Sequence, residues 1–516
     1  MERTARRVIS RQISNFVIAV IVLAPIQMFA DSFFTPGNLV VSVEGDGSGT
    51  GGYTDNQAAP LTLYQYTTGG HFVNSLELPQ TGSGANFAVS GEYGSSSEGT
   101  LQLSGNGQYL TIMGYGINAN TFNASPGSYG PNSANTALAQ SGSLTGQSYT
   151  PVARVVALID ASGGVNSSTA LYNVFDQNNP RSAYTMNGSS IYVSGQGAGG
   201  DTTAGVFLAT KGSNSATAIS GNDAGAGTSQ DTRDVQIYNN TLYVSVDSKS
   251  GTPNRDYIGT LGTAGTPPTS LANGGNGPAM LSGYGNPGGT GRVTITAGTT
   301  NGINSPGQTI NLSPENYFFA NASTLYVADS GSPKNTSEQN VSGGSPLGDG
   351  GLQKWVNSKP DGTGTWTLEY TLSAGLGLVP NSQPDNPLGD DTTGLLGLTG
   401  ELIGNEVELF ATNYTIGDTD PTFLFGITDS LSATTLPTNE SFTELATAPA
   451  DSNFKGVSFA PVPEPATFAL FGLGMTALVA ARRRVSRASD GAQRSPRVQL
   501  DGAFERPSVQ PTAITG

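Results

Sequence analysis

Short runs of apolar, β-branched and aromatic residues recur along the chain, and each run follows a turn that contains Asn or Gly. Asn and Gly tolerate the positive φ of a tight hairpin turn, whereas β-branched and aromatic residues favour strands. The pattern therefore predicts one turn-and-strand unit, repeated six times. The six copies are GNLVVSVEGDG (37–47), GNGQYLTIMGYG (105–116), NGSSIYVSGQG (187–197), NNTLYVSVDS (239–248), NASTLYVADSG (321–331) and GNEVELFATN (404–413).

Further strands flank most copies in a common order. Before the turn come RSAYTM (181–186), RDVQIY (233–238), ENYFFA (315–320) and TGLLGLTG (393–400). After the strand come AGVFLATKG (204–212), DYIGTLG (256–262), GLQKWVNS (351–358) and TFLFGITDS (422–430). Some copies add a fourth strand, as in GTWTLEYTL (364–372) and ESFTELATA (440–448). Four antiparallel strands per repeat predict the blades of a β-propeller.

The two ends of this region complement each other. The segment FKGVSFAPV (454–462) has the pattern of an inner strand with no blade of its own, while the first copy begins without its inner strand. Pairing residues 456–460 with residues 39–43 would close the ring and remove the open sheet edges. We therefore predict an all-β protein in which residues 31–460 form a β-propeller of six four-stranded blades, or seven if a long gap hides a weak blade.

Two other all-β architectures compete with this prediction, a pair of β-sandwiches and a β-solenoid. The copies are unevenly spaced, because Gly-, Asn- and Pro-rich insertions such as 117–150 and 271–310 separate some of them. A solenoid needs a regular period, so the uneven spacing argues against it.

The N-terminal 30 residues have the pattern of a secretory signal peptide. Arg3, Arg6, Arg7 and Arg11 precede an uncharged stretch at 16–30, and Asp31 follows it. A basic region, an apolar core and a small residue before the mature start predict a signal helix that is cleaved, here after residue 30. The alternative is an uncleaved membrane anchor.

Near the C-terminus, the stretch VPEPATFALFGLGMTALVAARRR (462–484) combines three features. Residues 466–481 carry no charge and could rise about 24 Å as a helix, a little less than the roughly 30 Å hydrocarbon core. Pro463 and Pro465 keep the chain before it extended. The positive-inside rule places the arginines on the cytoplasmic side. These residues, Arg482, Arg483 and Arg484, follow a predicted transmembrane helix.

This combination resembles the PEP-CTERM sorting signal of bacterial surface proteins, in which a Pro-Glu-Pro motif, a transmembrane helix and an Arg cluster follow one another. Pro463, Glu464 and Pro465 match the motif, and 482–484 match the cluster. The resemblance implies a sorting signal at 461–484. It also implies recognition by an exosortase, a membrane transpeptidase that transfers the protein to the cell surface or matrix. The alternative is a simple tail anchor.

The 32 residues after the arginines depart from that family, whose chains normally stop there. Residues 485–516 are polar, contain Pro and show no apolar period, so we expect them to be disordered. They are either an altered reading frame at the end of the gene or a cytoplasmic tail that impedes sorting.

The amino-acid composition excludes several kinds of binding and catalytic site. Only 12% of the residues are charged and the net charge is −16, which argues against a nucleic-acid partner, because phosphate binding needs a basic surface. There is no cysteine, so thiolate catalysis, iron–sulfur clusters and cysteine zinc sites are excluded. The single histidine, His71, lies at a predicted hairpin, where a surface position is the ordinary explanation.

Acidic residues just after the repeated strands are the candidate site. The element LYVADSG (325–331) resembles blades of NHL-like propellers, a likeness too short to carry an activity. If the blades are in register, the acids share one rim and could hold Ca²⁺, which takes six to eight oxygen ligands. The alternative is a turn role through side-chain to backbone hydrogen bonds, with no cofactor. The candidates are Asp46, Asp201, Asp247, Asp329 and Asp418.

No catalytic constellation is recognisable, although glycoside hydrolysis needs only two carboxyl groups about 5 to 9.5 Å apart. The sequence does not place Glu369, Asp390, Asp391 and Glu401 that finely. We therefore predict an exported, non-enzymatic binding or structural propeller of the cell surface or matrix, with surface polysaccharide as a candidate partner. The alternative is a secreted propeller hydrolase or lyase acting on extracellular polysaccharide. A carboxylate pair in the central channel would favour the alternative; Ser, Thr and apolar side chains there would favour the binding protein.

Overall fold

The computed structural model describes residues 32–198, 202–220, 231–248, 255–284, 294–296, 309–331, 350–379, 391–417 and 419–464. The chain divides into two compact units, Ala30–Glu464 and a second made of Met1–Phe29 with Pro465–Gly516. Every described residue belongs to the first unit. The predicted signal peptide, the predicted membrane helix at 466–481 and the tail at 485–516 lie outside the described residues.

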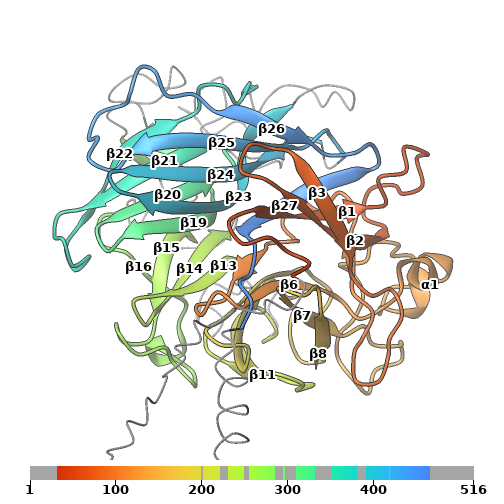
Figure 1. Ribbon diagram of the computed structural model, residues 1–516. Helices are drawn as coiled ribbons and strands as arrows, with labels where there is room; N and C mark the ends of the chain where they lie inside the picture. The colour runs from red at the N-terminus through yellow and green to blue at the C-terminus, as the bar shows by residue number, and fades with distance from the viewer. Residues whose placement is uncertain are drawn as a thin grey trace, which may run out of the picture. The chain divides into compact units, whose positions relative to one another are not determined.

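Four sheets of the first unit are separate, four-stranded, antiparallel blades (Figure 1). In each blade, strands that follow one another along the chain are neighbours in the sheet. The first contains β9 (Pro180–Thr185), β10 (Ser190–Gly195), β11 (Gly205–Thr210) and β12 (Thr217–Ala218). The second contains β13 (Thr232–Tyr238), β14 (Thr241–Ser248), β15 (Arg255–Leu261) and β16 (Ala279–Met280). The third contains β19 (Pro314–Asn321), β20 (Thr324–Asp329), β21 (Gly351–Asn357) and β22 (Trp366–Leu372). The fourth contains β23 (Thr392–Ile403), β24 (Glu406–Thr415), β25 (Phe423–Ser430) and β26 (Thr443–Thr447).

A fifth, nine-stranded sheet contains the remaining strands of the ring. Its order is β27 (Ser452–Phe459), β1 (Leu39–Gly45), β2 (Ala58–Tyr66), β4 (Ser90–Glu92), β6 (Tyr109–Tyr115), β7 (Arg154–Asp160) and β8 (Val165–Leu171), with β3 (Phe72–Glu77) paired to β2 and β5 (Gln102–Leu103) paired to β6. The fold is therefore propeller-like with four separate blades, and the predicted count of six or seven is corrected. The physical reason is β4, which pairs with both β2 and β6 and joins two predicted blades into one sheet.

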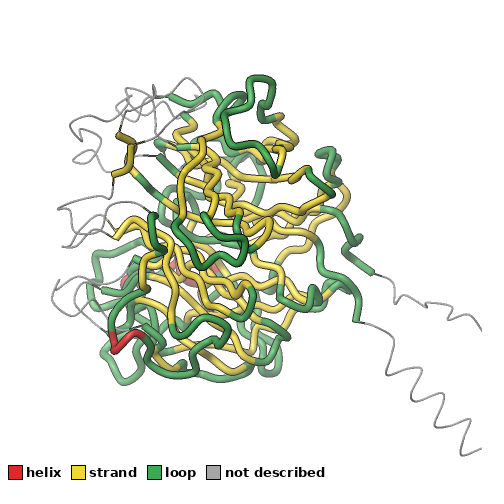
Figure 2. The backbone as a smooth tube through the Cα atoms, turned by 90° about the vertical axis from the view of Figure 1, so that its left-hand side faces the viewer, coloured by secondary structure: helices red, strands yellow, loops and turns green. Residues whose placement is uncertain are grey.

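Short elements complete the described structure, in which strands far outnumber helices (Figure 2). Helix α1 (Ala119–Ala124) begins where the Asn118 side chain accepts a hydrogen bond from the Thr121 N–H, as an N-cap does. The others are two 3₁₀ turns (Pro126–Ser128 and Asn273–Gly275) and the two-stranded sheet of β17 (Thr294–Thr296) and β18 (Thr309–Asn311). None of the helices in the described ranges is long and apolar enough to cross a membrane.

The predicted pairing of the two ends of the propeller region is confirmed. Strand β27 pairs with β1 in antiparallel register, with Leu39 opposite Phe459 and Val41 opposite Val457. Leu39, Val41 and Val457 are fully buried, so this pairing also closes an apolar layer. The strands that lie nearest the centre, β27, β5, β9, β13, β19 and β23, contact one another in that order around it.

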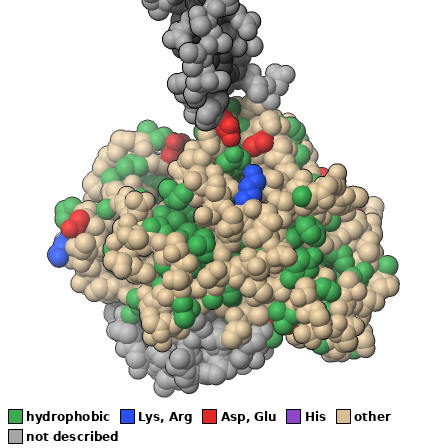
Figure 3. Space-filling view, turned by 90° about the horizontal axis from the view of Figure 1, so that it is seen from below, with side chains coloured by type: hydrophobic (Ala, Val, Ile, Leu, Met, Phe, Trp, Pro, Cys, Tyr) green, Lys and Arg blue, Asp and Glu red, His purple; other side chains and the backbone are tan. Residues whose placement is uncertain are grey.

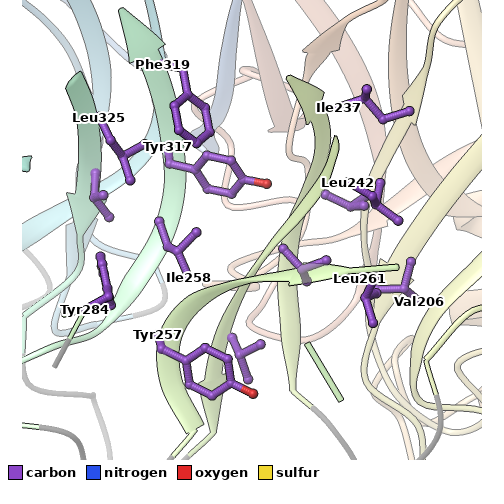
Figure 4. Close-up of a cluster of buried hydrophobic side chains, with 14 of the residues drawn as sticks. Val206, Ile237, Leu242, Tyr257, Ile258, Leu261, Tyr284, Tyr317, Phe319 and Leu325 are labelled. Carbon is purple, nitrogen blue, oxygen red and sulfur yellow. The ribbon is translucent and has the colours of Figure 1, made fainter. Parts of the chain in front are cut away.

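The largest apolar cluster lies where three blades meet (Figure 4). Val206 of β11, Ile237 of β13 and Leu325 of β20 are buried in it. Each fully buried aliphatic side chain of this kind stabilises the fold by about 1.5 to 3 kcal/mol. Trp355 of β21 stacks on Tyr284 with ring centroids 4.1 Å apart, so this aromatic packs in the core and is not available to a ligand.

A buried ion pair links β21 to β25 in neighbouring blades. The Lys354 ammonium lies 2.9 Å from an oxygen of Asp429, and both side chains are fully buried. The hydroxyls of Tyr326 and Tyr370 donate hydrogen bonds to the same carboxylate. Such a pair holds two blades in register, because removing either charge would leave the other buried without compensation.

Both ends of the described unit lie at the same end of the strands. The Phe34 N–H donates to the Ala161 carbonyl in the turn after β7, and the Val462 N–H donates to the Gly107 carbonyl in the turn before β6. These turns are neighbours, because the start of β6 pairs with the end of β7, Tyr109 opposite Asp160. We call this the terminal end of the propeller and the other the charged end, for the reason given next.

Candidate functional site

Buried ionisable side chains gather at the charged end. There the inner strands β9, β13 and β19 begin, and their neighbours β10, β14 and β20 end, because adjacent strands are antiparallel. Charged side chains are scarce in this chain, and Figure 3 shows a face on which they are few. Their concentration inside the protein is therefore its most distinctive chemical feature. These buried side chains include Glu44, Glu92, Glu98, Arg154, Arg181, Asp231, Arg233, Asp247, Glu315, Asp329 and Lys455.

Arg233 on β13 is the centre of the first cluster. Its guanidinium lies 3.5 Å from Asp231, 3.3 Å from Asp247 and 3.2 Å from Glu315. Burial lowers the pKa of Arg233, but the carboxylates of Asp231 and Glu315 outweigh it and hold the pKa above the usual range. Burial raises the pKa of Glu315 to about 7 against the opposing effect of Arg233. Arg181 of β9 completes the cluster with an ion pair to Asp231.

Two of the five predicted rim aspartates are brought together beside this cluster. The Ser313 hydroxyl donates to Asp247 at 3.0 Å and the Ser313 N–H donates to Asp329 at 2.8 Å. Asp329 also accepts hydrogen bonds from the Gln353 amide at 2.8 Å and from the Gly331 N–H at 2.9 Å. Asp247 and Asp329 are thus joined through hydrogen-bond donors of the protein itself.

Of the three other rim candidates, the structure describes one, Asp46. Asp46 is exposed and accepts a hydrogen bond from the Ser48 N–H, two residues on, as Asp329 does from Gly331. This is the turn role that the sequence left as the alternative. Asp201 and Asp418 lie outside the described residues. In the part of the chain that the structure describes, no three acidic or histidine side chains are grouped as a metal site requires, so the Ca²⁺ site stays a prediction.

A second cluster contains three glutamates and was missed by the sequence analysis. Glu98 accepts hydrogen bonds from the Tyr115 hydroxyl and, at 2.6 Å, from the Asn179 amide. Its other oxygen is 3.3 Å from the Glu92 N–H. Among the described residues none donates a hydrogen bond to Glu44, whose carboxylate is 3.8 Å from the Lys455 ammonium. Burial raises the pKa of all three carboxyl groups, which favours their protonated forms.

Asp234, a buried acid outside these two clusters, joins three inner strands near the centre. It accepts hydrogen bonds from Gln102 of β5, from Ser182 of β9 at 2.8 Å and from Gln236 of β13 at 3.4 Å. Burial raises its pKa to about 6, although these hydrogen bonds act in the opposite direction. The side chain is 1% exposed, so its role lies within the protein.

Two of the carboxylates considered for glycoside hydrolysis, Asp391 and Glu401, lie far apart. Asp391 directly precedes β23 and Glu401 lies ten residues further along that strand, about 30 Å away at the rise of a strand. Glu369 lies on β22, the fourth strand of its blade, and Asp390 is outside the described residues. The separation far exceeds the 5 to 9.5 Å that a pair of catalytic carboxyl groups needs. His71 is exposed in the turn between β2 and β3, where the sequence placed it.

An open groove of about 690 Å³ lies beside helix α1. The loop after β3 and the segment that leads from β6 into α1 form its walls, and none of its lining side chains is charged. Its polar side chains are amides and hydroxyls, which donate and accept hydrogen bonds without a net charge. The lining residues are Gln80, Thr81, Gly82, Gly84, Asn86, Phe87, Ala88, Gly116, Ile117, Asn118 and Thr121.

Comparison with known proteins finds the PEP-CTERM protein-sorting motif at residues 461–484. No curated protein matches the chain. Similar solved structures include a hypothetical selenium-binding protein from Sulfolobus tokodaii (12% identity, TM-score 0.39, covering 83% of this chain and 94% of that one). They also include a polysaccharide lyase, an ulvan lyase, at 10% identity and a TM-score of 0.34, covering 81% of this chain and 82% of that one. A Bacillus subtilis arabinanase matches at 15% identity and a TM-score of 0.27, covering 51% of this chain and 78% of that one. Each TM-score is below 0.5, so these likenesses carry no argument for an activity.

The fold and the motif together define the class of protein. Strand topology gives an all-β, propeller-like unit, and the chain that leaves it carries a PEP-CTERM sorting motif. That motif implies an exported protein that is processed by an exosortase, a membrane protein.

Proposed function

We propose that the protein is a non-enzymatic binding propeller, delivered by the exosortase system to the cell surface or matrix. The observation that supports this most strongly is the pairing of the buried charges. Arg233, Asp247 and Glu315 are engaged with one another, and Asp329 is engaged by backbone and amide donors. Groups held this way maintain the arrangement of the inner strands, which is a structural role.

The groove beside α1 is the proposed binding surface, and its ligand would be a neutral stretch of surface polysaccharide. Amide and hydroxyl side chains such as Asn86 and Thr121 suit the hydroxyl groups of sugars, and the half-buried ring of Phe87 offers an apolar face. The absence of charged side chains from the groove lining argues against an anionic ligand.

Binding can be tested with the exported protein and the polysaccharides of its host, by titration calorimetry with neutral and anionic glycans. Thr121→Trp places a bulky side chain in the groove, and we expect it to weaken binding of the neutral glycan at least about tenfold. Thr434→Trp, at an exposed site in another loop, is the matched control and should bind like the wild type. Equal affinity of the two variants would place the ligand elsewhere and contradict the proposal.

A second candidate function is hydrolysis or lysis of extracellular polysaccharide. It is favoured by one observation, the adjacency of Glu92 and Glu98, whose pKa values burial raises. A carboxyl group that stays protonated near neutral pH can act as a general acid. Release of reducing ends or of unsaturated products, abolished by Glu98→Gln while the fold is retained, would support this enzyme. Unchanged glycan chain length after long incubation would exclude it for the glycans used.

A further inference from the structure

The residues that lead into the sorting motif lie on the surface of the propeller. After β27 ends at Phe459, the Ala460 N–H donates to the Asn38 carbonyl at 2.8 Å. The Val462 N–H donates to the Gly107 carbonyl at 2.8 Å. The Tyr109 hydroxyl then donates to the Glu464 carboxylate at 3.0 Å. Glu464 is the central residue of the Pro-Glu-Pro motif, so the motif is bound to the turn between β5 and β6.

The turn is shaped to accept this segment. Gly107 has φ of +72°, and a Cβ built there would lie 3.4 Å from a methyl carbon of Val462, at van der Waals contact. Tyr109 is partly buried, which fixes the direction in which its hydroxyl points. One backbone hydrogen bond and one charge-assisted hydrogen bond therefore hold residues 462–464.

The chain between the last strand and the motif is short, so the motif stays close to the propeller. Four residues lie between Phe459 and Glu464, so their Cα atoms are at most about 18 Å apart when the chain is fully extended. A transpeptidase must enclose the extended backbone around the motif in its active site. It cannot do so while the Val462 backbone and the Glu464 carboxylate are engaged by the propeller.

We propose that the propeller masks its own sorting motif, and that release of residues 461–464 from the β5–β6 turn precedes processing by the exosortase. The inference rests on the sorting function that the motif implies. It assigns a positioning role to Tyr109 and Gly107, which lie outside the motif. In the opposite relation the turn would present the motif to the enzyme. Weakening the contact would then slow processing, and the experiments below distinguish the two relations.

The first experiment follows the full chain by pulse-labelling in the host, with an epitope after residue 484, and measures the rate at which the epitope is lost. Tyr109→Phe removes the hydrogen bond to Glu464 and keeps the ring. Because an exposed hydrogen bond of this kind has a modest net strength, we expect processing to be roughly two- to fivefold faster. Tyr53→Phe, a partly buried tyrosine at the charged end, is the matched control and should leave the rate unchanged.

The second experiment locks the contact. The chain has no cysteine, so Gly107→Cys with Val462→Cys creates a single disulfide, at a site where a Cβ on residue 107 would lie 3.4 Å from a methyl carbon of Val462. We expect the oxidised form to resist processing in membranes that contain the exosortase, and reductant to restore it. The single variant Val462→Cys, with and without reductant, controls for effects on the enzyme.

The outcomes separate this inference from the sorting function. Wild-type chain that is processed only in the presence of the exosortase establishes sorting. If Tyr109→Phe is then processed at the wild-type rate or more slowly, or if the locked form is processed normally, masking is refuted while sorting stands. If the wild type is never processed, sorting fails and the masking inference falls with it.

Discussion

Replacing Asp234 with asparagine should change the way in which stability depends on pH. The carboxyl group lies between three inner strands and is 1% exposed. Asn has the same shape and can still accept hydrogen bonds from Gln102 and Ser182 through its carbonyl oxygen. It is neutral at every pH, so Asp234→Asn isolates the cost of burying the charge.

The sign and size of this pH dependence follow from the pKa of Asp234 in the folded and in the unfolded chain. Burial raises the pKa of Asp234 from 3.8 to about 6 in the folded protein. The folded state therefore keeps a proton that the unfolded chain has released, and stability falls as pH rises from about 3.8 to about 6 and is constant above that. A difference of about 2.2 pH units corresponds to about 3 kcal/mol, of which about 2 kcal/mol falls between pH 4.5 and 7.5.

The assay is urea unfolding of wild type and variant at several pH values in this range, followed by tryptophan fluorescence. We expect the free energy of unfolding of Asp234→Asn to gain about 2 kcal/mol on that of the wild type between pH 4.5 and 7.5. Asp46→Asn, at an exposed aspartate, is the control and should follow the wild-type curve. Parallel curves for wild type and Asp234→Asn would refute the reasoning, because they would mean that no proton is taken up at this site on folding.

Other predictions concern the remaining buried charges and the closing strand. Arg233→Met leaves the carboxylates of Asp231, Asp247 and Glu315 without their main cation, and should lower the free energy of unfolding by about 3 to 5 kcal/mol at pH 7.5 in urea titrations. The loss should be smaller at pH 5, because Glu315, with its pKa raised to about 7, takes up a proton there; an equal loss at both pH values would contradict this. Lys354→Met should cost a similar amount, and the double variant Lys354→Met/Asp429→Leu should recover part of it. Ser458→Pro removes a donor from the pairing with β1 and should shift the urea midpoint further than Val462→Pro, which lies beyond the sheet.

The strands were predictable because their pattern is local. Runs such as NNTLYVSVDS and NASTLYVADSG carry turn residues followed by β-branched and aromatic ones, and both form strands where expected. The pairing of β1 with β27 could be inferred because the first copy lacks an inner strand and the last segment is an inner strand without a blade. The division into blades could not, since β4 is the three-residue stretch SGE, which has no apolar run to mark it.

The candidate site was only partly visible in the sequence. Asp247 and Asp329 lie at the ends of repeated strands, and the common strand direction in the blades places both at the charged end. Glu92 ends the short strand β4 and Glu98 lies in the loop after it, within the stretch GEYGSSSEG, where an acid normally indicates solvent exposure. A usable signal did exist for Arg233 and Lys455, because each is a charge inside an apolar strand of a chain poor in charges. Only tertiary packing decides whether such a charge is paired inside the protein.

Closure by β27 determines when the protein can finish folding. The Gly456 N–H donates to the Ser42 hydroxyl, across a sequence separation of 414 residues. Bringing the ends of so long a segment together costs about 5 kcal/mol of chain entropy, so this contact forms late unless the intervening sheets are already assembled. Until residues 452–459 have crossed the membrane, β1 exposes an unpaired edge to which a second chain could add. The segment that follows is the sorting signal, so the chain is still held at the membrane when its last strand arrives. Tethering at that moment keeps nascent chains apart and gives intramolecular closure the advantage over aggregation.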